Sequence, residues 1–366
     1  MPKTAKHLII GSTEAYSGKS TLSIAIGSQL QKLGFQVGWG KPLSSVDTFG
    51  HGLEHLDSDL SFVPTTLALA SEHQPPNLLS LDSKTLVDRL RQEAVQTLDD
   101  ALKHYWEDAQ GDIMLLEGPS TLEEGALFNL SLPEMAAALD AQVVLVMQFD
   151  TRRMVDQLVA AQKRLGRALI GVVLNGVSEA DVVLIQDTIA PYLEQQGIAV
   201  IATLPQLSFL QGIRVSELVR YLDAEVLCSS DHLDLVVESL KIGAMNVNSA
   251  LRFFGQGHHQ AVVTGGDRRD LQIAALETST HCLVLTGQIA PARDVLALAK
   301  DKEVPVLSVA TDTLTTVERI DMLFGRVPLN NPDKIPLIQE HLADQVDIER
   351  LIALVGLERP AIAPRS

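Results

Sequence analysis

One stretch near the start of the chain has the residue types of a phosphate-binding loop. Residues 11–21 read GSTEAYSGKST and lie between the apolar run HLII and the helical pattern TLSIAIGSQLQKLG. In such a loop, backbone N–H groups and the positive end of a helix hold phosphate oxygens. We expect Lys19, exposed at the loop, to reach the β- and γ-phosphates of a nucleotide. We expect Ser20 to bind Mg²⁺ through its hydroxyl.

The spacing within this loop departs from the common pattern. Six residues separate Gly11 from Gly18, which is a longer interval than usual, and Thr13 stands where the first glycine is normally found. The alternative interpretation is a strand-to-helix turn that contains Gly-Lys-Ser by chance. The predicted nucleotide-binding residues of the loop are Gly11, Thr13, Gly18, Lys19, Ser20 and Thr21.

The elements that must position this loop alternate between apolar runs and helical patterns. Runs such as HLII, IMLLE, VVLVM and GVVL, separated by helices, are typical of an α/β fold with a mainly parallel sheet and helices on both faces. Ligands of such folds bind at the carboxyl ends of the strands. Gly11, Lys41, Glu117 and Asn175 follow four different predicted strands. We therefore expect them at one edge of a P-loop NTPase-like sheet.

The pattern changes near residues 205–215. Beyond this point the apolar runs QAVVTGG, CLVLTG and VPVLSVA alternate with helical segments, which predicts a second, smaller α/β unit. We place a P-loop ATP-binding domain at residues 1–212, a second domain at 213–332, and a C-terminal helix and tail at 333–366.

Composition excludes several classes of partner. The 366-residue chain has 29 basic and 46 acidic side chains, a formal net charge of −17. This balance argues against nucleic acid, because a phosphate backbone demands a basic face. Cys228 and Cys282 form no CxxC pair, which favours reduced thiols. The chain shows no membrane-length apolar stretch and no signal-peptide pattern, so we expect a cytoplasmic protein without membrane contact.

Two groups of motifs resemble known families. The first half resembles the dethiobiotin synthetase-like P-loop family, which includes cobyrinic acid a,c-diamide synthase, in its displaced-glycine loop, in Lys41-Pro42 and in Glu117-Gly118. The second half resembles a DRTGG domain in VVTGGDRRDLQIAAL, from Val262, and in the preceding IGAMNVNSALRFF. This order of domains resembles the N-terminal arrangement of long bacterial phosphate acetyltransferases. The residues of this sequence contain no match to the acetyltransferase catalytic domain of that family, so we expect no acetyl transfer to phosphate by this chain alone.

The resemblance implies roles for residues beside the phosphate loop. Lys41 would bind a substrate carbamate and the transferring phosphate, and Ser45 would contact the substrate. Glu117 would hold Mg²⁺, which takes one or two carboxylates besides phosphate oxygens. The predicted catalytic residues are therefore Lys19, Lys41 and Glu117. The synthetases continue from this glutamate with a glycine-rich stretch, whereas Gly118 is followed here by Pro-Ser, a departure that affects substrate handling.

Two further positions take roles from the same resemblance. Asp59, in the segment DSDLSF, would hold Mg²⁺ together with Ser20 and Glu117. Asp57 is a rival of Asp59 as the Mg²⁺ ligand. The alternative to a metal-binding role is that Asp57 and Asp59 are turn residues. Asn175 would read the adenine edge, although asparagine also occurs as a turn residue at strand ends.

In the second half, residues 264–268 form a predicted strand-to-helix turn, TGGDR. Gly265 and Gly266 would let backbone N–H groups approach an anion, and Arg268 or Arg269 would add charge. This would make a regulatory site for a nucleotide or small molecule. The equal alternative is a structural turn with Asp267 as the helix N-cap. If the turn needs φ > 0 at Gly266, valine cannot replace it.

We therefore expect an Mg-ATP-binding regulatory protein, related to the N-terminal region of phosphate acetyltransferase, that acts on a metabolic enzyme or senses a small metabolite. The alternative is an ATP-dependent carboxylate or carbamate ligase of the dethiobiotin synthetase type, which retention of Lys19, Lys41 and Glu117 favours. A slow ATPase switch lies between the two. A homo-oligomer is the expected state of such a protein.

Overall fold

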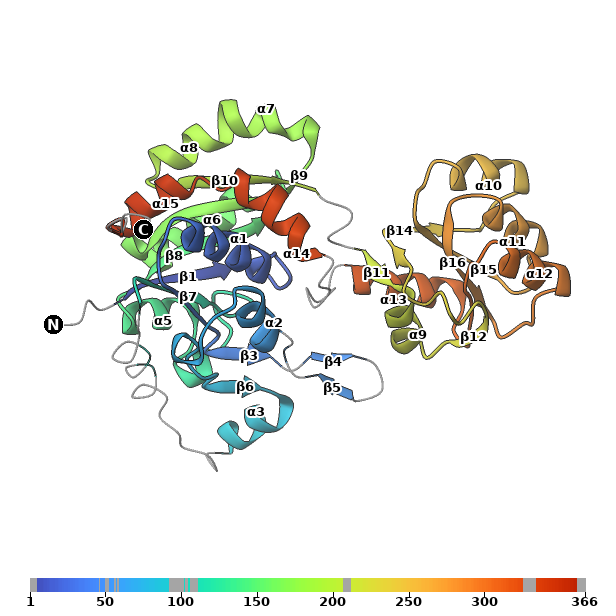
Figure 1. Ribbon diagram of the computed structural model, residues 1–366, viewed down its shortest axis with the longest axis horizontal. Helices are drawn as coiled ribbons and strands as arrows, with labels where there is room; N and C mark the ends of the chain where they lie inside the picture. Colours follow the sequence, from blue (N-terminus) through green and yellow to red (C-terminus); the bar gives the residue numbers. More distant parts are fainter. Residues whose placement is uncertain are drawn as a thin grey trace, which may run out of the picture. The chain divides into compact units, whose positions relative to one another are not determined.

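The computed structural model describes residues 5–360 except 46, 50–52, 56, 58, 92–101, 103–104, 106–110, 207–211 and 325–333 (Figure 1). Contacts divide the chain into two compact units. The first comprises residues 1–48, 54–206 and 328–366, and the second comprises residues 49–53 and 207–327.

The first unit is built on a six-stranded parallel sheet in the order β10-β9-β8-β1-β7-β2. β1 lies inside the sheet, where Ile10 pairs with Glu117 of β7 and Gly11 pairs with Leu145 of β8. Both faces of the central strands are buried, which explains their continuous apolar runs. The strands are β1 (Lys6–Ser12), β2 (Val37–Gly40), β7 (Ile113–Glu117), β8 (Gln142–Gln148), β9 (Leu169–Val177) and β10 (Ala199–Pro205).

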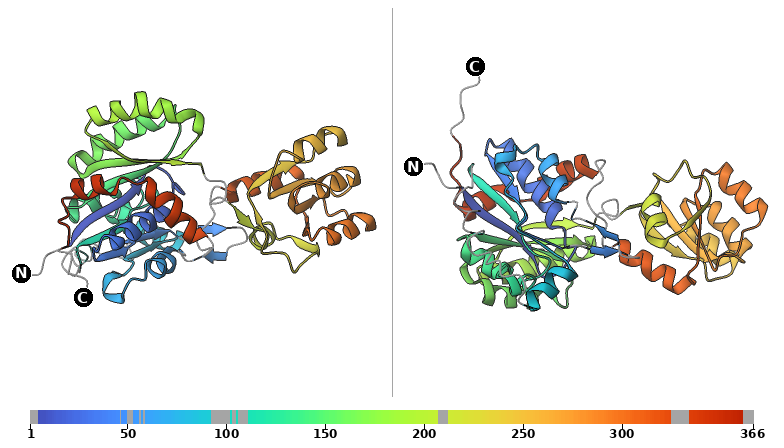
Figure 2. Two further views of the ribbon diagram at one scale, coloured as in Figure 1. Left: turned by 45° about the horizontal axis from the view of Figure 1, so that its top comes forward. Right: turned by 90° about the horizontal axis from the view of Figure 1, so that it is seen from below.

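Helices cover both faces of this sheet (Figure 2). α1 lies against β1, β2 and β7. On the other face, Leu132 of α5 and Leu158 of α6 share a core with Ile9 of β1. The helices of this part are α1 (Lys19–Lys32), α2 (Asp59–Thr66), α3 (Ser83–Leu90), α5 (Leu132–Ala138), α6 (Met154–Leu165), α7 (Val182–Leu184) and α8 (Ala190–Gln195). Two short strand pairs lie outside the main sheet. β3 (Leu43–Ser45) pairs with β6 (Leu79–Leu81) in the first unit, and β4 (Asp47–Phe49) pairs with β5 (Leu53–His55), two strands that the boundary between the units divides.

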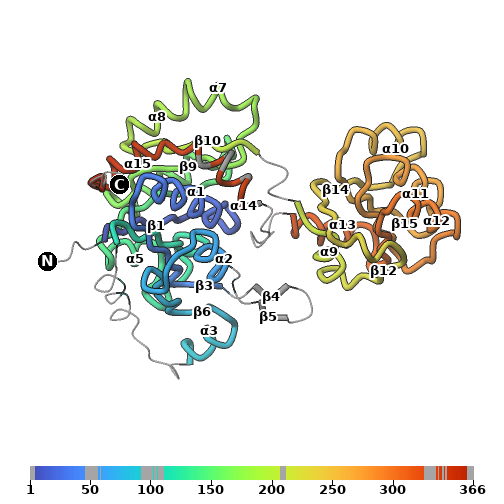
Figure 3. The backbone as a smooth tube through the Cα atoms, viewed as in Figure 1, coloured from blue at the N-terminus to red at the C-terminus, as the bar shows by residue number. Residues whose placement is uncertain are grey.

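The last helices of the chain belong to the first unit. The segment that follows α14 (Lys334–Leu337) packs on α1, and α15 (Ile348–Val355) packs on α1 and β10 (Figure 3). Nε2 of Gln142 in β8 donates to the carbonyl of Leu354 at 3.1 Å. Arg350 pairs with Glu194 at 2.5 Å. The expected C-terminal helix is thus a structural layer of the first unit, while residues 361–366 of the expected tail lie outside the described residues.

The second unit has a five-stranded sheet in the order β12-β17-β16-β15-β14. Four strands are parallel, and β12 is an antiparallel edge. α10, α11 and α12 share a core on one face, and α9 and α13 share a core on the other. The strands are β11 (Ile213–Arg214), β12 (Glu225–Cys228), β13 (Val236–Val237), β14 (Ser239–Ile242), β15 (Gln260–Gly265), β16 (Thr280–Thr286) and β17 (Val306–Val309). The helices are α9 (Val215–Leu222), α10 (Val247–Phe254), α11 (Arg269–Leu276), α12 (Arg293–Asp301) and α13 (Thr313–Phe324).

The predicted fold class is confirmed: a mainly parallel, helix-covered sheet is followed by a smaller α/β unit. Among the described helices, none combines the length and the apolar character that a bilayer crossing requires.

Candidate functional site

The predicted phosphate loop joins β1 to α1 at the carboxyl end of an inner strand. Tyr16 (φ 57°) and Gly18 (φ 102°) adopt left-handed conformations, a backbone that turns N–H groups into a concavity. α1 begins at Lys19 with no side-chain cap and no acidic residue in its first turn. Thr21 follows in that turn and is partly exposed. The uncapped helix start and the turned loop together have the form of an anion site.

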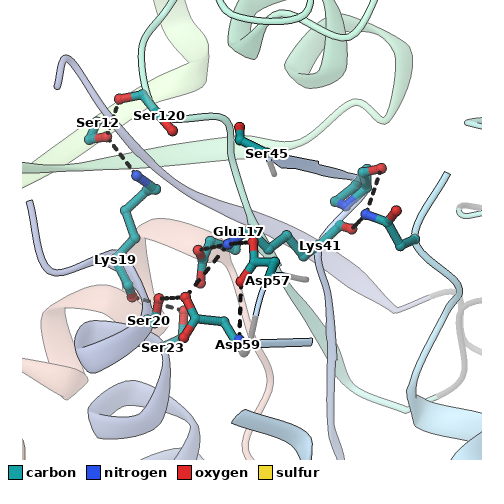
Figure 4. Close-up of polar contacts among 12 residues, drawn as sticks. Ser12, Lys19, Ser20, Ser23, Lys41, Ser45, Asp57, Asp59, Glu117 and Ser120 are labelled. Carbon is teal, nitrogen blue, oxygen red and sulfur yellow. Dashed lines mark hydrogen bonds and ion pairs between the residues drawn. The ribbon is translucent and has the colours of Figure 1, made fainter. Parts of the chain in front are cut away.

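Lys19 is buried, with only 8% of the residue exposed. Its Nζ donates to Oγ of Ser12 at 3.0 Å (Figure 4). Burial lowers the pKa of Lys19, Glu117 opposes this shift, and Lys41 reinforces it. The expectation of an exposed lysine is therefore wrong, because the side chain turns toward the strand that precedes the loop instead of toward solvent.

Lys41 lies in a cluster of carboxylates. Its Nζ is 2.5 Å from Oδ2 of Asp57, 2.8 Å from Oε1 of Glu117 and 3.6 Å from Oδ2 of Asp59 (Figure 4). Burial alone would lower the pKa of Lys41, but Glu117, Asp59 and Asp57 outweigh it and raise the pKa. The ammonium is therefore held charged in a cluster with an excess of carboxylates.

The three predicted metal ligands gather around this lysine. Oγ of Ser20 donates to Oδ2 of Asp59 at 2.7 Å. Burial and then Glu117 raise the pKa of Asp59 to about 6. Its rival Asp57 accepts the backbone N–H of Asp59 at 3.0 Å and pairs with Lys41. Asp59 is thus the aspartate that contacts the phosphate-loop serine.

The donor set fits Mg²⁺, which prefers oxygen ligands and takes only one or two carboxylates when phosphate oxygens are present. Glu117 is 2% exposed, and its Oε2 has no hydrogen-bond partner among the described residues. A buried carboxylate oxygen without a partner is costly. In the described part of the chain, no group of at least three His, Cys, Asp or Glu residues forms a ready-made metal site. Water or phosphate oxygens would therefore have to complete any coordination here.

Asn175 stands beside the phosphate loop. Its Nδ2 donates to the carbonyl of Ser17 at 2.9 Å. A Cβ at Gly18 would lie 2.7 Å from the same Nδ2, so glycine at 18 serves both the left-handed conformation and this close approach. The hydroxyls of Ser17 and Thr13 are buried and have no partner in the described residues. The structure thus places Asn175 against the phosphate loop itself.

Gly11 has a packing role in β1. A Cβ there would lie 2.5 Å from Cδ2 of Leu132, so the missing side chain allows α5 to approach the sheet. The structure places Gly11 within β1, before the loop itself.

Ser45 lies at the end of β3 and contacts the segment that follows β7. Its Oγ donates to Oε1 of Glu124 at 2.6 Å, and the other oxygen of Glu124 accepts the backbone N–H of Ser120. Oγ of Ser12 donates to the carbonyl of Ser120 at 2.9 Å. The sequence does not indicate that Glu124 accepts a hydrogen bond from Ser45 or that Ser12 donates to Ser120, because residues so far apart along the chain leave no local pattern.

Asn77 is another residue that the sequence reasoning missed. Its Nδ2 donates to the carbonyl of Lys41 at 2.8 Å and lies 3.3 Å from the carbonyl of Pro42. The backbone of the Lys-Pro pair is therefore fixed from the start of the β6 segment. The two adjacent prolines before Asn77 mark a loop but do not indicate this contact.

In the second unit, the predicted regulatory residues form the turn between β15 and α11. Arg268, not Asp267, holds the N-cap position of α11, so the expected Asp267 cap is wrong. Arg268 donates to the carbonyl of Met245 at 3.1 Å and pairs with Asp270. The buried Gln272 donates to the carbonyls of both turn glycines, 265 and 266, at 2.9 and 3.0 Å.

The need for glycine at position 266 is steric. Neither turn glycine has a positive φ, so the expected conformational reason does not apply. A Cβ at Gly266 would instead lie 2.4 Å from the carbonyl oxygen of Ile289. The turn is therefore closely packed as well as hydrogen-bonded.

A loop and helix of this form, placed after an inner strand of a parallel sheet, define a P-loop nucleotide-binding protein. Residues 6–214 match the family model described as AAA domain, and the chain belongs to this family. Residues 217–323 match the model of the DRTGG domain. The predicted order, a dethiobiotin synthetase-like P-loop domain followed by a DRTGG domain, is confirmed.

Relatives share both domains. The chain is 26% identical to a phosphate acetyltransferase of Nitratidesulfovibrio vulgaris, over 95% of this chain and 52% of that protein. It is 24% identical to a phosphate acetyltransferase of Pseudomonas aeruginosa, over 93% of this chain and 51% of that protein. The chain thus spans about half the length of these relatives and corresponds to their N-terminal half.

One solved structure is a regulatory region of Clostridium perfringens pyrophosphatase, its CBS and DRTGG domains with the activator diadenosine tetraphosphate. It is 18% identical, with a TM-score of 0.29 over 39% of this chain and 58% of that one.

Proposed function

We propose that this chain is an Mg-ATP-binding regulatory protein related to the N-terminal region of phosphate acetyltransferase, and that it binds ATP without ligating a substrate. The observation that carries the proposal is the contact between Ser45 and Glu124. An acidic substrate beside the nucleotide would need free donors. Here the Ser45 hydroxyl and the Ser120 N–H are both taken by a carboxylate of the chain itself.

The nucleotide part of the proposal rests on the phosphate loop. Lys19 supplies a buried cation beside an uncapped helix start. Ser17 and Glu117 hold buried oxygens that have no partner in the described chain. Mg²⁺, held by Ser20, Asp59 and Glu117, would neutralise phosphate charge, which is the main requirement of a nucleoside triphosphate site.

Calorimetric titration with Mg-ATP tests this proposal. We expect Lys19→Met, which keeps the length of the buried side chain, to weaken Mg-ATP binding by about 100-fold, because a charged hydrogen bond to phosphate is lost. Lys32→Met, at the exposed end of the same helix, is the matched control and should bind as the wild type does. Failure of the wild type to bind Mg-ATP would refute the nucleotide assignment.

A ligase of the dethiobiotin synthetase type is the second candidate, and the position of Lys41 beside Glu117 favours it. The two functions predict different rates of ATP hydrolysis. A ligase would hydrolyse ATP faster when a suitable carboxylic acid or carbamate is added, whereas the proposed binder would show the same low rate with and without it. Glu124→Ala, which frees the Ser45 hydroxyl, is the informative variant. Acid-dependent turnover in the wild type would favour the ligase.

The regulatory part of the proposal concerns a metabolic enzyme as partner, in the cytoplasm, with the chain as a homo-oligomer. The relatives named above are phosphate acetyltransferases of about twice this length, so an acetyltransferase catalytic domain is the first partner to test. Its rate of acetyl transfer should change when this chain is added with Mg-ATP and stay unchanged when the Lys19→Met variant is added. Light scattering after size-exclusion chromatography would give the oligomeric state.

A further inference from the structure

The ammonium of Lys41 lies at the centre of the cluster that the proposed function assigns to Mg²⁺. It is 2.8 Å from Glu117 and 3.6 Å from Asp59, two of the proposed metal ligands. The third ligand, Ser20, donates to the same Asp59 oxygen that faces Lys41. The side chain of Lys41 is 11% exposed. A buried cation thus already lies among the oxygens that a metal ion would use (Figure 4).

Lys41 and a divalent ion at this site would compete for the same oxygens. Asp57 and Glu117 contact the Lys41 ammonium directly. A divalent ion at the Ser20 side of the cluster would share Asp59 and Glu117 with it. Like charges at contact distance in a low-dielectric site repel strongly. A divalent ion on the same oxygens of Asp59 and Glu117 would therefore push the ammonium of Lys41 away from them.

We infer, on the basis of the proposed function, that Lys41 is the internal counter-ion of this site, and that a divalent metal displaces its side chain from Glu117 and Asp59. Nucleotide phosphates assist the exchange in two ways. They complete the coordination of the metal, and they give the displaced ammonium a new anionic partner. Metal and nucleotide consequently bind cooperatively, and metal alone binds weakly.

The surrounding contacts confine this movement to the side chain. Asn77 holds the backbone carbonyl of Lys41 at 2.8 Å, so the four-carbon stem has to carry the displacement. Oε2 of Glu117, which lacks a partner among the described residues, provides an oxygen for the metal while Oε1 is still paired with Lys41. The exchange can therefore begin before the ion pair is fully broken.

Binding of Mn²⁺ without nucleotide, measured by electron paramagnetic resonance, tests the inference. We expect Lys41→Met, which removes the ammonium and keeps the length of the side chain, to bind Mn²⁺ at least about tenfold more tightly than the wild type. Lys41→Arg keeps the charge and should bind as weakly as the wild type. Adding Glu117→Gln to Lys41→Met should abolish the gain. An unchanged Mn²⁺ affinity in a folded Lys41→Met protein would overturn the inference.

A second measurement uses the wild-type protein and does not depend on the variant folding. Competitive acetylation reports the accessibility of each lysine amine. Millimolar Mn²⁺ should increase the labelling of Lys41 and leave the exposed Lys32 unchanged. Equal labelling of Lys41 with and without Mn²⁺ would contradict the exchange. These tests use metal alone, so their failure is distinguishable from failure of the proposed function, which the Mg-ATP titration decides.

Discussion

Oε1 of Glu117 lies 2.8 Å from Nζ of Lys41, while its Oε2 has no partner among the described residues. Both groups are buried, and Asp57 and Asp59 add further negative charge around the single ammonium of Lys41. Such an arrangement is poor for stability, because each carboxylate loses hydration and only part of that loss is recovered. Active and binding sites commonly retain such costs, and the cluster therefore indicates a ligand that adds positive charge.

Glu117→Gln should separate stability from binding. Removal of this carboxylate breaks its ion pair with Lys41 and also relieves repulsion with Asp59, so we expect the free energy of unfolding at pH 7 to stay within about 1 kcal/mol of the wild-type value. Mg-ATP affinity should fall, because a metal ligand is lost. The pKa of Asp59 should also fall, since Glu117 is one of the causes that raise it. Urea unfolding and a carboxyl NMR titration measure these effects, and a much less stable variant with an unshifted Asp59 would contradict the prediction.

Binding of Mg-ATP should depend on pH through Asp59. The pKa of this carboxyl is raised to about 6, chiefly by burial, and the metal needs the ionised form. Below pH 6, each further drop of one pH unit should therefore weaken Mg-ATP binding by about tenfold. The free protein holds one proton on Asp59 in this range and releases it when Mg-ATP binds. Titration calorimetry at several pH values measures this. ATP with a chelator is the control, because metal-free binding should change less. A flat affinity between pH 7 and 5 would exclude Asp59 as a ligand.

The same group has an opposite effect on the stability of the free protein. Its pKa is higher in the folded chain than the ordinary value of 3.8, so the folded state binds this proton more tightly than the unfolded state. The resulting stability is fully present below pH 3.8 and is lost as the pH rises through 6. Acid thus favours the folded state through Asp59 while it weakens metal binding.

Asn175→Ala should show whether this residue holds the loop or reads the base. The structure shows Nδ2 bonded to the carbonyl of Ser17. If this contact is its role, the variant should weaken ATP, GTP and pyrophosphate binding alike, by about fivefold to tenfold, in line with one lost hydrogen bond. If it reads adenine, ATP binding should fall while GTP and pyrophosphate binding stay constant. Asn248→Ala, an exposed site on α10, is the control and should change none of them.

The sequence predicts the fold well because the central strands of both sheets are apolar and buried on both faces. It also predicts Lys19 and Ser20 at the helix start, since loop and helix are adjacent in the chain. The contact of Glu124 with Ser45 joins segments far apart in sequence, and nothing local indicates it. The sequence also does not predict that residues 334–355 pack on the first unit, because this contact too joins distant parts of the chain. An amphipathic helix such as α15 shows that it covers a surface but not which surface.

Replacement of Gly266 should destabilise the second unit for a steric reason. A Cβ at this position would lie 2.4 Å from the backbone oxygen of Ile289 and 2.8 Å from its Cβ. Backbone cannot move as a side chain can, so we expect Gly266→Ala to cost about 1–3 kcal/mol and Gly266→Val to cost more. The loss should appear in thermal unfolding of the full chain, in the transition that belongs to the DRTGG domain.

Gly265→Ala is the matched control for this prediction. Its Cβ would meet only Oδ1 of Asp267 within 3 Å, and a carboxylate at the end of a side chain can turn away. Neither glycine has a positive φ, so both alanines are acceptable to the backbone and the comparison isolates the contact with Ile289. Hydrogen exchange of α11 should therefore increase for Gly266→Ala and change little for Gly265→Ala. Equal effects of the two substitutions would show that the close approach of Ile289 does not determine the need for glycine at 266.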